Sequence, residues 1–159
     1  MPRKVTKSLV RPVQPDRLYN NEMVTRLINR VMLNGKKQLA ERLVYTGMQK
    51  AADRLKVENP LEVFEVAMKN IMPHMETRSR RVGGANYQIP FEVKGQRQNH
   101  LTMMWFVAAA RSRKGMSMAD RIAAELQDAY NGQGSAVKKR EDTHKMADAN
   151  RAFAHFARS

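Results

Sequence analysis

The chain has 159 residues, of which 42% are hydrophobic, and its 29 lysines and arginines outnumber its 15 aspartates and glutamates by fourteen charges. This hydrophobic content excludes a disordered polycation. The absence of cysteine excludes disulfides, thiolate zinc sites and a cysteine nucleophile. The length favours one domain with a substantial core, and the positive surplus favours a polyanionic partner, which inside a cell is mostly nucleic acid.

The first segment, residues 1–15, is predicted to be a flexible basic arm, because it contains three prolines and no acidic residue. It lacks the apolar stretch of a secretory signal. The longest apolar run in the chain, residues 103–110, is much shorter than the roughly 20 residues needed to cross a bilayer. We therefore expect a soluble protein that stays inside the cell and has no membrane partner.

Three helices are predicted next. Apolar residues recur at helical spacing from Met23 to Val31 and stop at Asn34-Gly35, which favours a left-handed turn. A second apolar stripe runs from Leu39 to Leu55. The third helix begins at Asn59, a capping residue followed by a proline at the first helical position, and ends before Pro73.

A period of two replaces the helical period between His74 and Val93, and it predicts a β-hairpin that turns at Gly83-Gly84. The first strand is too polar to bury both faces. Pro90 in the second strand has no N–H to donate to a ladder. We therefore expect this hairpin, at about residues 74–93, to project from the helices.

Three more helices complete the prediction. The fourth, from about Gln96 to Arg113, is apolar on nearly every side and is expected to be central, with Trp105 in the core. The fifth begins at Ser117, and the sixth begins at Ser135, with lysines at its start and aromatic residues near its end. The predicted fold is mainly α: a single domain of about six helices over residues 16–159, with a two-stranded hairpin between helices three and four.

The positive surplus is concentrated in two segments of the sequence. Residues 1–11 and 78–114 together carry eleven of the fourteen surplus charges, whereas the third and fifth helices are net acidic. The first strand of the hairpin carries Arg78, Arg80 and Arg81. Their positive charges repel one another unless anions bind to them, and the planar guanidinium group is well suited to binding phosphate.

Other residues of the basic segments leave two interpretations open. Gly83 and Gly84 would let the backbone approach a polynucleotide closely, but turn geometry alone also explains them. Tyr87 is suited equally to stacking on a base and to covering the sheet. The run Lys138-Lys139-Arg140 is half neutralised by the two acids that follow it and by itself favours a solvated helix face.

Enzymatic chemistry has no positive support in the sequence. The four histidines, at 74, 100, 144 and 155, are too far apart to suggest a metal cluster, and His144 with Asp148 forms only a two-ligand pair on one helix. Glu62 and Glu65 are explained by the dipole of the third helix. No phosphate-binding or dinucleotide-binding glycine motif occurs. We therefore predict no enzyme, no metal and no cofactor.

Two alternatives remain open from the residues alone. The break at residues 114–116 is compatible with a helix-turn-helix in a basic DNA-binding regulator, although the acidic fifth helix would then meet phosphates repulsively. A small metal-dependent hydrolase built on His144 is the third candidate. A basic arm and a basic hairpin suit the grooves and junctions of folded RNA better, where shape and backbone are recognised.

Two long motifs resemble a known family. The stretches 79–90 (SRRVGGANYQIP) and 136–155 (AVKKREDTHKMADANRAFAH) closely resemble the bacterial form of the small-subunit ribosomal protein S-seven family, as do 35–37 (GKK) and 60–64 (PLEVF). The resemblance runs from about Pro15 to Phe156. Departures lie at residues 96–100, where family members often carry more basic residues, and at the end of the chain, where many carry a Tyr-Arg-Trp-like tail.

The resemblance implies a non-enzymatic ribosomal protein of a cytoplasmic ribosome, and it does not exclude an organellar one. It implies binding to the 3′ major domain of the small-subunit ribosomal RNA, nucleation of head assembly, and a place beside the exit site for tRNA and mRNA. The implied ribosomal RNA contacts are Arg3, Lys4, Lys7, Arg11, Lys36, Lys37, Lys94, Arg97, Arg111, Arg113 and Lys114. The implied exit-site contacts are Arg78, Arg80, Arg81, Gly83, Gly84 and Tyr87. The C-terminal helix, with Lys138, Lys139 and Arg140, is implied to approach ribosomal protein eleven.

Overall fold

The computed structural model describes residues 12–157 and is mainly helical, so the predicted fold class is confirmed. The elements in chain order are α1 (Glu22–Val31), α2 (Lys37–Leu55), α3 (Pro60–Ile71), β1 (Met75–Val82), β2 (Ala85–Glu92), α4 (Gly95–Ser112), α5 (Met118–Tyr130), α6 (Ser135–Ala149) and the 3₁₀ helix η1 (Arg151–Ala157). The predicted arm contacts Arg3, Lys4, Lys7 and Arg11 lie outside the described residues.

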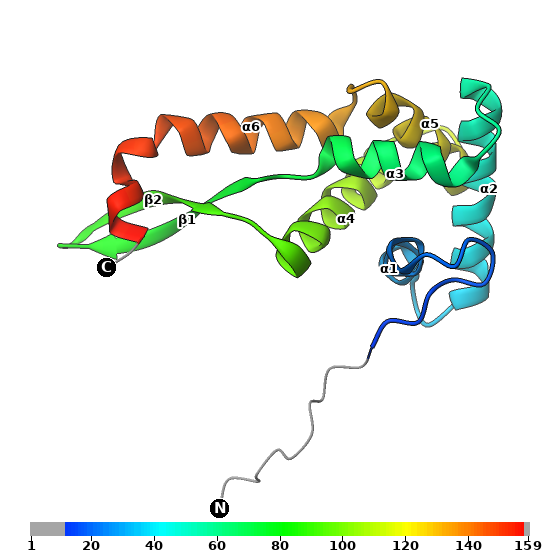
Figure 1. Cartoon of the computed structure of the whole chain (residues 1–159), viewed down its shortest axis with the longest axis horizontal. Coiled ribbons are helices and arrows are strands. Elements are labelled where there is room, and N and C mark those ends of the chain that lie inside the picture. The colour runs from blue at the N-terminus through cyan, green and yellow to red at the C-terminus, as the bar shows by residue number, and fades with distance from the viewer. Residues whose placement is uncertain (1–11, 158–159) are drawn as a thin grey trace, which may run out of the picture.

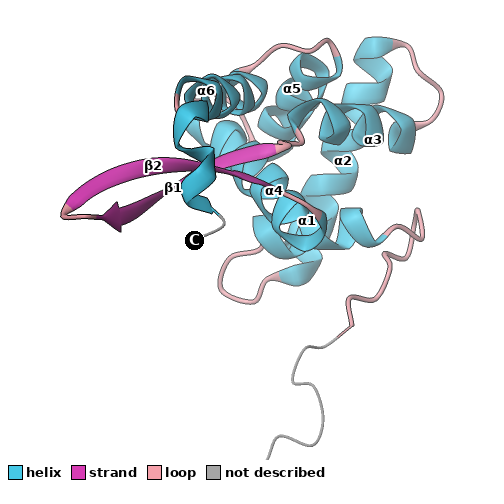
Figure 2. Ribbon diagram, turned by 60° about the vertical axis from the view of Figure 1, so that its left-hand side comes forward, coloured by secondary structure: helices cyan, strands magenta, loops and turns pink. Residues whose placement is uncertain are grey.

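The hairpin extends to one side of the molecule, and helices α1 to α5 gather at the other (Figure 1). Helix α6 runs back from this helical end alongside the hairpin, and η1 packs against β2 (Figures 1 and 2). The hairpin therefore lies between α3 and α4 and extends beyond the helical core, as predicted. It does not project alone, however, because α6 and η1 brace it along its length.

The helix ends lie where the sequence places its caps. As predicted, the side chains of Asn59 and Ser117 each accept a hydrogen bond from a backbone N–H in the first turn of α3 and α5; Asn21, which the sequence analysis did not single out, caps α1 in the same way. Asn34 and Gly35, at φ of +51° and +72°, take the left-handed conformation between α1 and α2. These local signals are independent of tertiary packing, which is why they could be predicted.

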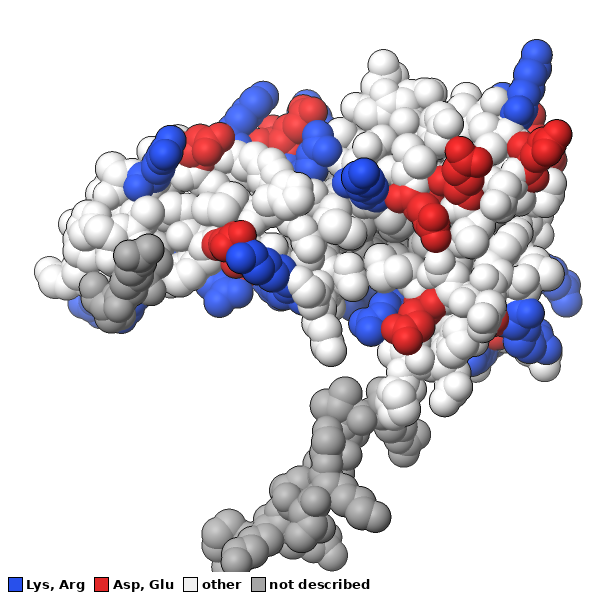
Figure 3. Space-filling view, viewed as in Figure 1, with Lys and Arg blue, Asp and Glu red and all other residues white. Residues whose placement is uncertain are grey.

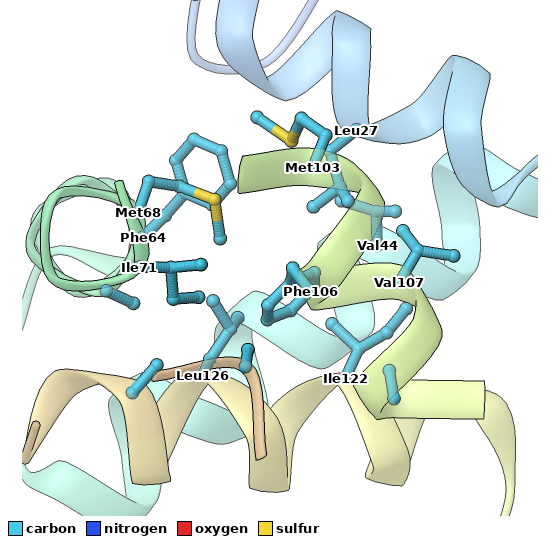
Figure 4. Close-up of a cluster of buried hydrophobic side chains, with 14 of the residues drawn as sticks. Leu27, Val44, Phe64, Met68, Ile71, Met103, Phe106, Val107, Ile122 and Leu126 are labelled. Atoms are coloured by element: carbon cyan, nitrogen blue, oxygen red, sulfur yellow. The ribbon is translucent and has the colours of Figure 1, made fainter. Parts of the chain in front are cut away.

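The core lies between α1 and α5, around the centre of α4. Phe64, Phe106, Leu27, Ile122 and Leu126 are each completely buried, and their side chains converge from four helices, α1, α3, α4 and α5 (Figure 4). Trp105 is 8% exposed and belongs to the same core, as predicted. This continuous apolar interior fixes the positions of the helix ends and of the root of the hairpin.

Helices α2 and α5 approach each other at Gly47. A Cβ atom at this position would lie 2.6 Å from Cγ2 of Ile122 and 3.1 Å from the carbonyl oxygen of Ala119. Glycine is therefore required here by the close approach of the two helices rather than by its backbone conformation.

The C-terminal segment differs from the prediction. The sequence suggested one helix with aromatic residues near its end, but α6 ends at Ala149 and the aromatic residues Phe153 and Phe156 belong to η1. The side chain of Asn150 donates to the carbonyl oxygen of Met146, and the backbone N–H of Phe153 bonds to Asn150. This local side-chain bond competes with continuation of the α-helix and turns the chain toward the hairpin.

Candidate nucleic-acid interface

The strand register separates the arginines of the hairpin. Arg78 pairs with Ile89 and Arg80 with Tyr87, so these residues share one face, whereas Arg81 pairs with Asn86 on the opposite face. The sequence grouped Arg78, Arg80 and Arg81 as one cluster. In the structure they cannot act as a single guanidinium patch.

The tip of the hairpin is an open two-residue turn. Val82 pairs with Ala85, and between them Gly83 and Gly84 have φ angles of +58° and +91°. A Cβ atom at either glycine would meet nothing within 4 Å. The turn geometry therefore accounts for both glycines, and their exposed backbone is accessible to a ligand.

The C-terminal 3₁₀ helix covers the face that carries Arg80 and Tyr87. One guanidinium nitrogen of Arg80 donates to the carbonyl oxygen of Phe156 at 2.8 Å. The ring of Tyr87 lies 5.1 Å from that of Phe153 and 5.6 Å from that of Phe156, measured between centroids. Tyr87 therefore covers the hairpin and packs within the chain, which is one of the two interpretations that the sequence left open.

A buried carboxylate organises the root of the hairpin. Glu76 is only 6% exposed, and its two oxygens accept hydrogen bonds from Arg78 and from Arg97 at the start of α4. Burial disfavours the charged carboxylate, but the bonds from Arg97 and Arg78 outweigh burial and hold the pKa of Glu76 below its ordinary value. Part of the charge of these two arginines is therefore satisfied internally.

Arg113 is committed to an internal ion pair. It donates to Glu125, which is completely buried in α5, and also to Asp128. The other oxygen of Glu125 accepts the N–H of Ala136 at 3.1 Å, at the start of α6. Arg113 thus ties the end of α4 to α5, and through Glu125 to α6, so its guanidinium is already engaged by two carboxylates of the chain.

A second basic cluster lies at the corner where α1 and α4 end and α2 begins. Arg111 donates to the carbonyl oxygens of Arg30 and Val31 at 3.4 and 3.5 Å, and with Lys36 and Arg121 it lines a groove. Lys37 and Lys114 are exposed nearby in sequence. Arg97 lies about 21 Å from Arg111 along α4, so the basic residues of one sequence segment occupy two separate regions.

Several of these side chains have no internal counter-charge. Within residues 12–157, eight of the predicted basic contacts form no ion pair with a carboxylate: Lys36, Lys37, Arg80, Arg81, Arg111, Lys114, Lys138 and Lys139. Lys94 pairs with Glu92 in an exposed bridge. On α6, Lys138 and Lys139 are exposed, while Arg140 donates to the carbonyl oxygen of Asn70 and pairs with Glu141.

The positive charge does not form one continuous field on the face shown in Figure 3. Lysines and arginines there alternate with aspartates and glutamates over both the hairpin end and the helical end. On this face, the charge that is concentrated along the sequence is therefore divided among separate basic positions.

His74 and His144 interact, and the sequence did not predict this contact. The backbone N–H of His74 donates to Nε2 of His144 at 3.0 Å, and the two rings stack 6.1 Å apart. Burial lowers the pKa of His144, the charges of Arg140 and His74 lower it further, and Asp148 opposes them. A separation of seventy residues leaves no local signal from which this contact could be read.

The chain is similar in sequence to a known protein family. The sequence pattern of the family described as ribosomal protein S7p/S5e matches residues 2–151. The chain belongs to this family. The small ribosomal subunit protein uS7 of Symbiobacterium thermophilum is 56% identical over 146 residues, which are 92% of this chain and 93% of that protein. The proteins of the same name from Lactococcus lactis subsp. cremoris and Protochlamydia amoebophila are 58% and 47% identical over the same length, covering 92% of this chain and 94% and 93% of those proteins.

Membership of the S7p/S5e family confirms the resemblance and the prediction of a structural, non-enzymatic ribosomal protein. The structure also weakens the two alternatives. Helix α5, which a helix-turn-helix would place in a DNA groove, packs against α2, α3 and α4. Within the described residues, no group of three histidine, aspartate or glutamate side chains is positioned to hold a metal ion. None of the helices described is long and apolar enough to span a membrane.

Proposed function

We propose that this protein is a structural component of the small subunit of a cytoplasmic ribosome, that it binds the 3′ major domain of the small-subunit ribosomal RNA, and that it nucleates assembly of the subunit head. The observation that carries the proposal is the family match over residues 2–151, and the relatives it resembles are small-subunit proteins. The exposed basic side chains without an internal carboxylate provide the chemistry, because phosphate neutralisation dominates affinity for nucleic acid.

The corner of the helical end is the main proposed contact with ribosomal RNA. Lys36, Lys37, Arg111 and Lys114 are exposed there, and within the described residues no carboxylate neutralises them. Arg97 and Lys94 form a weaker second contact at the root of the hairpin, since each shares its charge with a glutamate. The basic residues of segment 1–11 would add to these contacts. Arg113 is left out, because its guanidinium serves Glu125 and Asp128.

The hairpin is the proposed contact with tRNA and mRNA at the exit site. Its accessible groups are Arg81 and the backbone at Gly83 and Gly84, which face solvent. Arg80 and Tyr87 support the hairpin through η1 in the state described here. Arg78 remains half exposed while it pairs with Glu76.

The exposed lysines of α6 are the proposed contact with a neighbouring ribosomal protein, protein eleven. Lys138 and Lys139 project from the outer side of the helix, whereas Arg140 is anchored to α3 through Asn70. Each lysine carries its ammonium group on a flexible side chain. Such groups are suited to contact with acidic side chains on the surface of a neighbouring protein.

The test is the salt dependence of binding to a fragment of the 3′ major domain. Replacing Lys36 and Lys37 by glutamine should reduce the slope of log affinity against log salt by about 1.4, taking roughly 0.7 per phosphate. The matched control replaces Lys56 and Lys69, which are equally exposed but lie away from this corner. Equal effects of the two double variants would overturn the proposed surface. Preference of the unsubstituted protein for random duplex DNA would overturn the proposed function in favour of a DNA-binding regulator.

A further inference from the structure

An exposed apolar groove lies between the α1–α2 connection and the start of α5. It encloses about 500 Å³, within the range of ligand-sized sites, and its floor is built from aliphatic side chains: Met32, Leu33, Leu39, Leu43 and Met118. Leu33 is 64% exposed and Leu39 is 49% exposed. Two neighbouring leucines so open to water mark a surface that gains free energy when a partner covers it.

The rim of the groove is cationic. Lys36, Arg111 and Arg121 line it, and none of the described residues around it is acidic. Arg121 donates to the carbonyl oxygens of Met116 and Arg111 at 2.9 and 3.4 Å, and Arg111 donates to those of Arg30 and Val31. Carbonyl oxygens fix these guanidinium groups in place without neutralising them, so the rim is preorganised for an anion.

We propose that this groove holds an unpaired base of the bound RNA, with the adjoining phosphates on Lys36, Arg111 and Arg121. An unstacked nucleotide combines an apolar ring face with an anionic backbone, which matches an apolar floor beside a cationic rim. Two of its rim residues, Lys36 and Arg111, are also among those that the proposed function assigns to the same RNA. The inference rests on that function and adds a recognition element that does not depend on charge.

The first experiment separates apolar from ionic contributions. The variant Leu33→Ser/Leu39→Ser should weaken binding of the 3′ major domain fragment about tenfold and leave the salt slope unchanged, because no charge is removed. Lys36→Gln/Arg111→Gln should instead reduce the slope. Leu18→Ser is the matched control, since Leu18 is 62% exposed but lies outside the groove. Thermal melting of each variant verifies that the fold is retained, as expected for exposed side chains.

The second experiment locates the occupant. The chain contains no cysteine, so Leu39→Cys provides a unique attachment point for a benzophenone photocrosslinker, and Leu18→Cys provides its control. Crosslinking from position 39 to a single unpaired nucleotide supports the inference. Unchanged affinity of Leu33→Ser/Leu39→Ser, or crosslinking in assembled subunits to an acidic protein segment instead of RNA, would overturn it while leaving the proposed function intact. If the unsubstituted protein failed to bind the fragment, the proposed function itself would fall.

Discussion

Replacing Arg113 by glutamine should destabilise the fold by about 3–5 kcal/mol, the usual cost of leaving a buried charge without its partner. Glu125 has no solvent exposure, and one of its oxygens receives both bonds from the guanidinium of Arg113. Removing the arginine leaves that oxygen charged and unsatisfied, while the bond from Ala136 to the other oxygen remains. For a chain of this length, the loss corresponds to a melting temperature lower by about 6–20 °C.

The assay is urea unfolding followed by the fluorescence of Trp105, the single tryptophan, which is buried in the core. The double variant Arg113→Gln/Glu125→Gln removes the buried charge and should recover part of the loss, so it should be more stable than Arg113→Gln alone. Arg111→Gln serves as the matched control: within residues 12–157 the exposed Arg111 side chain bonds to two carbonyl oxygens and to no carboxylate, so the change in stability should be less than about 0.5 kcal/mol. An Arg113→Gln variant as stable as this control would refute the assignment of Arg113 to an internal ion pair.

Contacts at Gly47, Tyr87 and His144 each control a measurable property of the fold. Gly47→Ala should lower the free energy of unfolding by about 1–3 kcal/mol, because the alanine Cβ would lie 2.6 Å from Ile122. An unchanged midpoint of thermal or urea unfolding would contradict the close approach of α2 and α5. Deleting residues 151–159 removes the rings of Phe153 and Phe156 that pack against Tyr87. Amide hydrogen exchange in β2 should then become about tenfold faster, with little effect on the helices. Unaltered exchange would show that η1 does not brace the hairpin. The folded-state pKa of His144 lies below its unfolded value, so the neutral imidazole stabilises the fold fully above about pH 6.5, and this stabilisation is lost as the pH falls. The free energy of unfolding should therefore decline from pH 7.5 to 5.5, and it should decline less in His144→Gln.

The sequence predicted the parts of the fold that depend on short-range signals. The caps at Asn59 and Ser117, the Asn34-Gly35 stop and the period of two around Tyr87 each depend on a few neighbouring residues, and each lies where it was expected. The predicted end of the sixth helix was wrong. The helix ends where Asn150 turns the chain toward the hairpin, which is distant in sequence.

The candidate site could be predicted less completely, because a basic residue in a sequence carries no record of its counter-ion. Glu76 comes shortly before the basic segment 78–114, and Glu125 follows it, so a count over that segment omits both acids. In the folded chain these two acids reach back into the segment and neutralise Arg78, Arg97 and Arg113. Only the tertiary structure identifies which cations are left for a ligand.

The distinction between paired and unpaired cations also explains why the two ends of the molecule suit different tasks. At the root of the hairpin, Glu76 is buried between two arginines, so these side chains are held rigidly and part of their charge is used to position the strands on α4. At the corner near Lys36 and Arg111, the cations are held by carbonyls or project freely, and they keep their full charge beside exposed leucines. A phosphate bound at the hairpin root would compete with Glu76, whereas one bound at the corner would displace only water. The corner should therefore contribute most of the affinity for ribosomal RNA, and the hairpin should contribute position and reach.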